Sequence, residues 1–291
     1  MKIIITISFF LLVTNVHSQE VNPQLPDFSE STSIPGMKLV WRDEFNENGQ
    51  PNPKFWKHEK GFVRNEELQW YQEGNASCQN GVLMIEGKRV RIPNPNFEAG
   101  NTSWRKNRKE INFTSASIQT KGLKEWQFGT FIIRARIDTT LGSWPAIWTL
   151  GKSGQWPSNG EIDIMEFYRV KSQPTILANV AHATDKQYVA KWDNSKTSLK
   201  HFIEKNKDWV KQFHIWRMEW TPESIYLFLD DELLNTTSLS ETSNPDGKNP
   251  FLQPHFLLLN LAIGGQNGGE PSPETKLIKY EVDYVRVYQK E

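Results

Sequence analysis

Short segments rich in β-branched and aromatic residues recur along most of the chain, and several alternate apolar with polar positions. Alternation with a period of two puts successive side chains on opposite faces of a β-strand. Clusters of Asn, Gly, Pro and Asp separate the segments, as expected of turns. Helical periodicity is confined to residues 205–212. We therefore expect an all-β protein with two packed sheets of antiparallel strands. The segments are KLVWRDEF, GVLMIEGKRV, GTFIIRARID, EIDIMEFY, SIYLFLD, HFLLLNLAIGG and EVDYVRVYQ.

The N-terminal 36 residues do not follow the strand pattern. In residues 1–18, a lysine precedes an eleven-residue apolar stretch, which predicts a secretory signal peptide cut near Ser18-Gln19 rather than a buried strand or helix. Residues 19–36 are rich in Pro, Ser and acids, and they predict a flexible leader. No repeat or linker divides the rest, so we expect one domain over residues 37–291. The protein should be secreted, either to the periplasm or outside the cell.

Composition narrows the classes of function. The 34 Lys and Arg residues equal the 34 Asp and Glu residues, which argues against a nucleic-acid partner. The lone Cys78 excludes an intrachain disulfide and a cysteine-rich zinc site. Beyond the N-terminus no apolar run is long enough for a membrane span. Twelve tryptophans exceed what a core needs, and they suit a surface that binds the flat faces of sugars.

Three acids stand among apolar residues in the segment GEIDIMEFY. Glu161 and Asp163 share one face of a strand, while a regular strand would put Met165 beside them and Glu166 on the opposite face. A bulge at Ile164–Met165 would return Glu166 to the acidic face. The alternative is a solvated acidic strand, but the neighbouring SWPAIWTLG is too aromatic for an ordinary wet surface.

Clustered carboxylates suit the hydrolysis of glycosidic bonds. A retaining glycosidase uses an ionised carboxylate as nucleophile and a protonated carboxyl group about 5–5.5 Å away as acid/base. Neighbouring negative charge and aromatic walls both raise the pKa of one carboxyl group, so that it keeps its proton.

The motif GEIDIMEFY with WPAIWTLG upstream resembles glycoside hydrolase family 16, in the members whose catalytic strand carries a bulge. LVWRDEFN, NEELQWY, TSASIQTKG, LLLNLAIGG and VDYVRVYQ extend the resemblance over most of the chain. The resemblance implies a β-jelly-roll sandwich with a carbohydrate cleft on its concave sheet. It also implies that Glu161 is the nucleophile, that Glu166 is the general acid/base and that Asp163 tunes the pair.

By the same resemblance the expected function is that of a secreted endo-β-glucanase. The substrate would be β-1,3-glucan, mixed-linkage β-1,3-1,4-glucan or both, as for laminarinases. Three departures from the family pattern lie near the cleft and put the linkage preference in doubt: Arg169, Ser117 and Gln266-Asn267.

Other functions stay open. One is a family 16 hydrolase of agarose, porphyran or carrageenan, for which Arg169 and Lys171 would face sulfate groups. A non-catalytic carbohydrate-binding sandwich and a transglycosylase are the others. The basic segment SWRKNRKE is expected to be a solvated loop.

The resemblance also indicates substrate-binding residues. Trp144 should stack on sugar rings. For Trp148, a place in the cleft and a place in the core are equally expected. The further expected cleft residues are Asn65, Glu67, Trp156, Tyr168, His182 and Asn260. A lone histidine such as His182 is more often a structural hydrogen-bonding residue than a catalyst.

No cofactor is expected for catalysis. Family members often hold a structural calcium ion on the convex side, and the matching residues are Asp283 through its side chain and Gly81 and Glu44 through carbonyl groups. The expected partner is a polysaccharide, and we expect a monomer.

Overall fold

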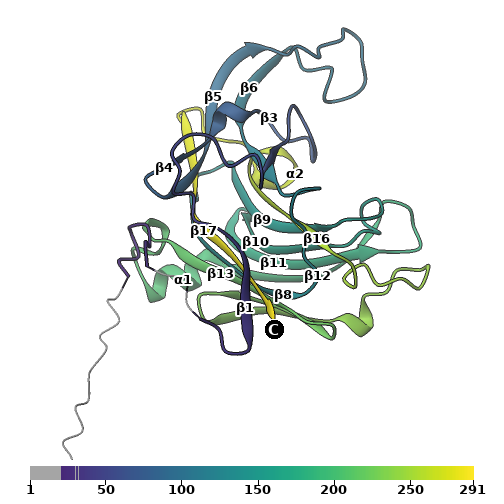
Figure 1. Cartoon of the computed structure of the whole chain (residues 1–291). Coiled ribbons are helices and arrows are strands. Elements are labelled where there is room, and N and C mark those ends of the chain that lie inside the picture. The colour runs from purple at the N-terminus through teal and green to yellow at the C-terminus, as the bar shows by residue number, and fades with distance from the viewer. Residues whose placement is uncertain (1–20, 30, 32) are drawn as a thin grey trace, which may run out of the picture.

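The computed structural model describes residues 21–29, 31 and 33–291, so the predicted signal peptide over 1–18 lies outside the described residues. Most described elements are strands (Figure 1). The strands are β1 Met37–Asp43, β2 Lys57–His58, β3 Gln69–Tyr71, β4 Ala76–Gln79, β5 Val82–Pro93, β6 Glu110–Ser115, β7 Ser117–Gln119, β8 Gly129–Ile137, β9 Ser143–Gly151, β10 Glu161–Val170, β11 Gln173–Ala183, β12 Ala190–Ser198, β13 His214–Trp220, β14 Ser224–Leu229, β15 Glu232–Ser238, β16 His255–Ile263 and β17 Leu277–Lys290. The helices are η1 Glu73–Asn75, α1 Leu199–Lys205, η2 Trp209–Lys211, η3 Leu239–Glu241 and α2 Gly265–Gly268.

Two packed sheets form the described part of the chain. The ten-stranded sheet runs β15-β14-β13-β8-β17-β5-β6-β3, with β1 also paired to β17 and β4 to β5. The seven-stranded sheet runs β12-β11-β10-β9-β16-β7-β2. The predicted all-β jelly-roll sandwich is confirmed. One pair departs from the expected antiparallel order, because β3 runs parallel to β6.

The burial patterns of the two sheets differ. Along β13 buried and partly exposed residues alternate, as for a strand with one face in the core. All nine residues of β16 are buried, because its second face lies under the cleft described below. Trp41, Trp216 and Trp220 lie in the core between the sheets. The sandwich therefore leaves one face of the seven-stranded sheet for a binding site.

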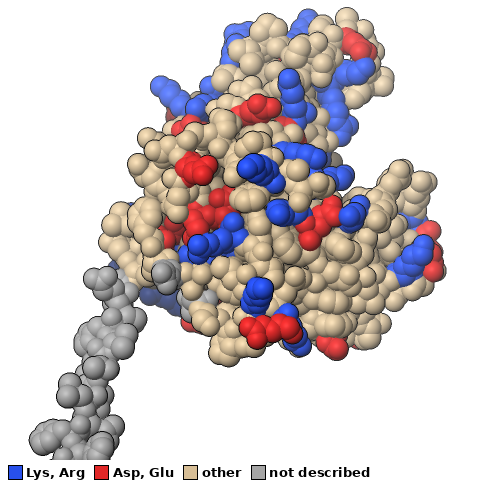
Figure 2. All heavy atoms as spheres, viewed as in Figure 1, with Lys and Arg blue, Asp and Glu red and all other residues tan. Residues whose placement is uncertain are grey.

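Charged side chains of both signs are interspersed over the face shown in Figure 2, and Lys and Arg are more numerous around the projecting β5–β6 hairpin. Among the described residues, no helix combines the length and the apolar character that crossing a membrane requires.

The described part of the expected leader is anchored to the ten-stranded sheet. The backbone N–H of Asp27 donates to the Asp283 carboxylate at 3.0 Å, and Arg134 donates to the carbonyl oxygen of Leu25 at 2.9 Å. The carbonyl oxygen of Pro23 accepts from Phe213. The prediction of a flexible leader is therefore corrected for these residues. Composition showed that these residues are polar. It could not show that their backbone groups form hydrogen bonds with residues distant in sequence.

The three residues expected to bind calcium lie together on the convex side. Asp283, Gly81 and Glu44 line one cavity of about 170 Å³. The Asp283 carboxylate, however, forms a buried ion pair with Arg134, and both carboxylate oxygens of Glu44 accept from Arg286 at 2.9 Å. Calcium takes six to eight oxygen ligands. As arranged, the one side-chain ligand expected for the ion, the Asp283 carboxylate, does not fit it, because Arg134 already neutralises this group. Among the described residues no group of three or more His, Cys, Asp or Glu side chains is suited to hold a metal.

Candidate active site

A bulge in β10 brings the three acids to one face of the seven-stranded sheet. Asp163 lies opposite Trp148 of β9 and Met165 lies opposite Ile147, so β10 has one more residue than its partner there. The register with β11 shifts over the same stretch. Ile164 and Met165 both point into the core and are fully buried. Two consecutive core-facing residues return Glu166 to the face of Glu161, as the sequence predicts.

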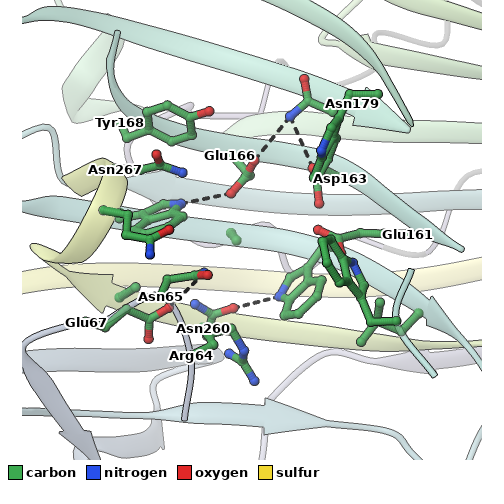
Figure 3. A pocket seen from close by; sticks show the side chains of 18 of the residues that line it. Arg64, Asn65, Glu67, Glu161, Asp163, Glu166, Tyr168, Asn179, Asn260 and Asn267 are labelled. Carbon is green, nitrogen blue, oxygen red and sulfur yellow. Dashed lines mark hydrogen bonds between the residues drawn. The ribbon is translucent and has the colours of Figure 1, made fainter. Parts of the chain in front are cut away.

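Each carboxylate of β10 accepts a hydrogen bond from a side chain that fixes its direction (Figure 3). The indole N–H of Trp156 donates to Glu161. The indole N–H of Trp144 donates to Oε1 of Glu166 at 2.8 Å. Asn179 donates to Oδ2 of Asp163 and to Oε2 of Glu166, both at 3.1 Å. The amide of Asn179 thus holds the middle acid and the last acid side by side.

Burial changes the protonation of all three acids. Desolvation, followed by the charge of Glu166, raises the pKa of Glu161 to about 7. The same two causes raise the pKa of Asp163 well above its ordinary value. Desolvation also raises the pKa of Glu166, against the hydrogen bond from Trp144. Hydrogen bonds with Asp163 lower the pKa of both Glu161 and Glu166, so the middle acid is coupled to both of its neighbours.

The acids lie on the floor of a cleft with a volume of about 630 Å³. Alternate residues of β9 form the floor beside β10: Ala146 pairs with Glu166, Trp148 with Asp163 and Leu150 with Glu161. The register therefore places an apolar row directly alongside the carboxylates. A cleft with aromatic walls and a few convergent polar groups is what a sugar-binding site requires.

The aromatic residues expected in the cleft line it. Trp144 packs edge-on against Tyr168, with ring centroids 5.6 Å apart. Trp148 lies on the cleft face, and its indole N–H donates to Asn260 at 2.7 Å. Trp156 also lines the cleft, with 38% of its surface exposed. Trp148, for which the sequence left cleft and core open, is a largely buried residue of the cleft floor.

A loop over residues 61–68 closes one end of the cleft. It contributes Arg64, Asn65 and Glu67 to the lining. Arg64 pairs with Glu59, which also accepts from the hydroxyl of Ser117 at 2.6 Å. The Arg64 guanidinium lies 5.1 Å from the centroid of the Trp148 ring. A positive group thus enters the cleft from this loop, held by a carboxylate behind it.

Desolvation raises the pKa of Glu67 to about 7, against the nearby charge of Arg64 and the hydrogen bond from Gln69. The side chain of Glu67 is buried and accepts from Gln69 and Asn65. Glu67 is thus a buried, hydrogen-bonded acid of the cleft lining.

The basic segment 103–110 supports this loop. Arg105 donates to the carbonyl oxygens of Phe62 and Val63. Arg108 donates to those of Glu67 and Glu66, the latter at 2.7 Å. The segment is a largely exposed loop, as expected, and these two arginines in addition bind backbone carbonyl groups of the 61–68 loop.

His182 does not lie in the cleft. Along β11 the residues Leu177, Asn179 and Ala181 share the face of the acids, so His182 points to the other side of the sheet. It is buried, and burial lowers the pKa of its imidazole. The expected contact of His182 with substrate is therefore wrong. The pairing of β11 with β10 decides which face His182 occupies, and no local motif shows this.

The structure adds cleft residues that the sequence did not predict as binding residues. They come from α2, β11, β12 and the 61–68 loop, and they are Arg64, Asn179, Trp192, Asn194, Gln266 and Asn267. The departures at Gln266-Asn267 were visible in the sequence. The residues of β11 and β12 could be found only after the strand pairing was known, since nothing in their own segments marks them.

Comparison with known proteins agrees with this geometry. The family model of Glycosyl hydrolases family 16 matches residues 66–286. A beta-glucanase of Rhodothermus marinus is 35% identical over 274 residues, which cover 89% of this chain and 87% of that protein.

Two solved structures have the same fold. The laminarinase of Rhodothermus marinus has a TM-score of 0.71 at 34% identity and covers 88% of this chain and 99% of its own. A structure of the endo-acting O-glycanases with which members of the human gut microbiota initiate mucin breakdown has a TM-score of 0.79 at 33% identity, covering 90% and 94%. Together with the bulged strand and its carboxylates, these matches show that the chain belongs to glycoside hydrolase family 16.

Proposed function

We propose that this glycoside hydrolase is a secreted endo-β-glucanase that cleaves β-1,3-glucan, mixed-linkage β-1,3-1,4-glucan or both, with retention of configuration. The observation that carries the proposal is the set of three carboxylates on one bulged strand within an aromatic cleft. The beta-glucanase and laminarinase relatives support the choice of substrate. Secretion rests on the signal peptide predicted over 1–18.

In the first step of the proposed mechanism, the Glu161 carboxylate attacks the anomeric carbon. The glycosidic bond breaks, and the Glu166 carboxyl group gives its proton to the leaving oxygen. The product is a glycosyl ester of Glu161 and a free chain end. In the second step the Glu166 carboxylate removes a proton from water, whose oxygen attacks the same carbon and releases Glu161.

The partners of the acids support these roles. Desolvation and the charge of Glu166 raise the pKa of Glu161 to about 7, and the hydrogen bonds from Trp156 and Asp163 oppose this rise, which helps the nucleophile to ionise. Burial raises the pKa of Glu166, which favours the protonated acid. Asp163 therefore acts as a positioning residue that tunes both glutamates through hydrogen bonds.

The roles of the two glutamates can be tested separately. We expect Glu161→Ala and Glu166→Ala each to lower kcat on the polymer by at least about 10³-fold, because each step needs both groups. Glu274→Ala, which removes an acid from an exposed loop outside the cleft lining, is the matched control and should keep most of kcat. Circular dichroism should show that each variant is folded. Substantial turnover by either glutamate variant would contradict the assignment.

The same variants distinguish nucleophile from acid/base. An aryl glycoside with a good leaving group needs no proton, so the first step should survive in Glu166→Ala, and azide should then accelerate turnover by taking the place of the activated water. Neither treatment should restore Glu161→Ala with retention of configuration. The reverse result would exchange the two roles.

A second candidate substrate is a mucin-type O-glycan. The observation that favours it is the TM-score, which is higher for the O-glycanase structure than for the laminarinase. Ser117 departs from the pattern of laminarinases. Its hydroxyl donates to Glu59, which pairs with Arg64 of the cleft lining, so this part of the cleft would bind a different sugar.

The sulfated galactans are disfavoured by the position of their expected contacts. Arg169 donates to the carbonyl oxygens of Thr139 and Thr140, and neither it nor Lys171 is among the cleft-lining residues. A panel of laminarin, mixed-linkage β-glucan, mucin O-glycans, agarose and carrageenan, followed by product analysis, separates these candidates. Cleavage of mucin O-glycans alone would replace the glucan proposal.

A further inference from the structure

A second aromatic wall lies in the cleft two strands away from the nucleophile. Trp192 of the edge strand β12 pairs with Ala181 of β11, and Ala181 pairs with Glu161 of β10. The three side chains therefore form a row on one face of the sheet. Two strand spacings separate the backbone of Trp192 from that of Glu161 by about 10 Å.

Ala181, in the middle of this row, carries only a methyl group; it is fully buried and is not among the cleft-lining residues, so the side chains on either side of it face the cleft. On the Glu161 side the indole of Trp156 is anchored by its hydrogen bond to the Glu161 carboxylate. The cleft beside the Glu161 carboxylate is therefore lined by two indoles, those of Trp156 and Trp192.

Both indoles are accessible, although large apolar side chains are usually covered. Trp192 is 40% exposed and Trp156 is 38% exposed, and both line the cleft. Indole rings that stay partly wet on the wall of a polar cleft are suited to stack on the C–H face of a sugar ring. Asn194, next along the cleft face of β12, offers an amide to hydroxyl groups.

We propose that Trp192 and Trp156 form a subsite for one sugar ring of the glycan on the β11–β12 side of the carboxylates. Trp192 is then a specificity-determining residue. The subsite favours a β-linked pyranose that presents an unbroken C–H face, since an axial hydroxyl or a charged substituent would separate the ring from the indole. The inference rests on the proposed function in needing a glycan long enough to reach from Glu161 to β12.

Kinetics of Trp192→Ala on the best polymer of the panel test the subsite. We expect KM to rise by about 3- to 10-fold, the effect of one stacking contact, with kcat changed less than about twofold. Trp192→Phe should lie between the wild type and Trp192→Ala, because a smaller ring keeps part of the stacking. In a Glu161→Gln background, the Kd for a long oligosaccharide should rise by the same factor.

Tyr188→Ala is the matched control. Tyr188 is an exposed aromatic residue, at 60%, in the turn before β12, and it does not line the cleft. Its removal should leave KM unchanged. An equal rise of KM in Tyr188→Ala, or a wild-type KM in Trp192→Ala, would overturn the subsite.

Chain length provides a second readout that altered folding would not produce. The effect of Trp192→Ala should disappear for the shortest oligosaccharides that the wild type cleaves, because they do not reach β12. A uniform effect at every length would overturn the proposal. If the wild type cleaves no polymer of the panel, the proposed function fails, whereas normal cleavage with an unaffected KM in Trp192→Ala contradicts the subsite alone.

Discussion

The three acids of β10 show how neighbours divide the roles of chemically similar residues. All three are desolvated, and burial raises the pKa of each. Their hydrogen-bond donors differ, however: Trp156 donates to Glu161, Trp144 donates to Glu166, and Asn179 donates to both Asp163 and Glu166. These donors therefore influence which acid holds a proton. Because the three acids interact, they titrate together as one group.

This arrangement predicts that the active site lowers the stability of the fold above mildly acidic pH. The pKa of Glu161 rises from 4.5 to about 7 on folding, so the native state binds more protons between these pH values and the free energy of unfolding falls as the pH rises through them. Glu161→Gln cannot ionise. We expect it to be as stable as the wild type near pH 4 and more stable by about 1–3 kcal/mol above pH 7.

Urea unfolding of both proteins across this pH range measures the difference. Glu274→Gln, which removes an acid on an exposed loop, is the control and should show no such pH dependence. A constant difference between Glu161→Gln and the wild type from pH 4 to pH 8 would contradict the raised pKa.

At the scale of elements, the cleft depends on a strand and on a supported loop. The bulge of β10 decides which face Glu166 occupies, since without the extra residue Met165 would stand beside Asp163. The 61–68 loop is held from two sides. Arg105 and Arg108 contact its carbonyl groups, and the backbone of Gln266 in α2 donates to the carbonyl oxygen of Asn65 at 3.0 Å. Gly265 permits this approach, because a Cβ there would lie 2.7 Å from the carbonyl oxygen of Asn65.

This support predicts a remote effect on substrate binding. Arg108→Gln removes the charged donor from the carbonyl groups of Glu66 and Glu67, so the loop that carries Arg64 and Glu67 should lose order. We expect KM to rise by about 3- to 10-fold. The change in kcat should be smaller, because the loop lines the cleft but carries none of the three acids of β10. Steady-state kinetics on the polymer measures both constants.

Arg91→Gln on the same hairpin serves as the control. Its side chain is 80% exposed and pairs with Glu110 at the surface, so its loss should leave KM unchanged. Equal effects of Arg91→Gln and Arg108→Gln would show that the hairpin acts by its net charge instead of by holding the loop.

At the scale of the whole molecule, the convex side is closed by the N-terminal segment. Arg134 of β8 and Asp283 of β17 form an ion pair in which the side chains are 5% and 3% exposed. The same two side chains bind the backbone of Leu25 and Asp27. One buried pair thus fixes the start of the described chain to the ten-stranded sheet.

Breaking this pair should destabilise the protein strongly. Arg134→Met leaves the Asp283 carboxylate buried without a partner, and we expect the free energy of unfolding to fall by about 3–5 kcal/mol. The double variant Arg134→Met with Asp283→Leu should recover a large part of the loss, since no charge stays buried. Denaturant unfolding with calcium and with a chelator measures both variants. Stabilisation of the wild type by calcium would contradict the pairing of Asp283 with Arg134 and would favour the calcium site instead.

The sequence by itself determined the strands, the fold and the candidate acids. Alternation and turn residues mark the strands locally, and the extra residue between Asp163 and Glu166 is visible in their spacing alone. Only the tertiary structure decided which residues join the acids in the cleft. Trp192 and Asn179 reach it because β11 and β12 pair with β10, whereas His182 is turned away by strand parity. These outcomes depend on contacts between segments distant in sequence, and a local pattern does not contain that information.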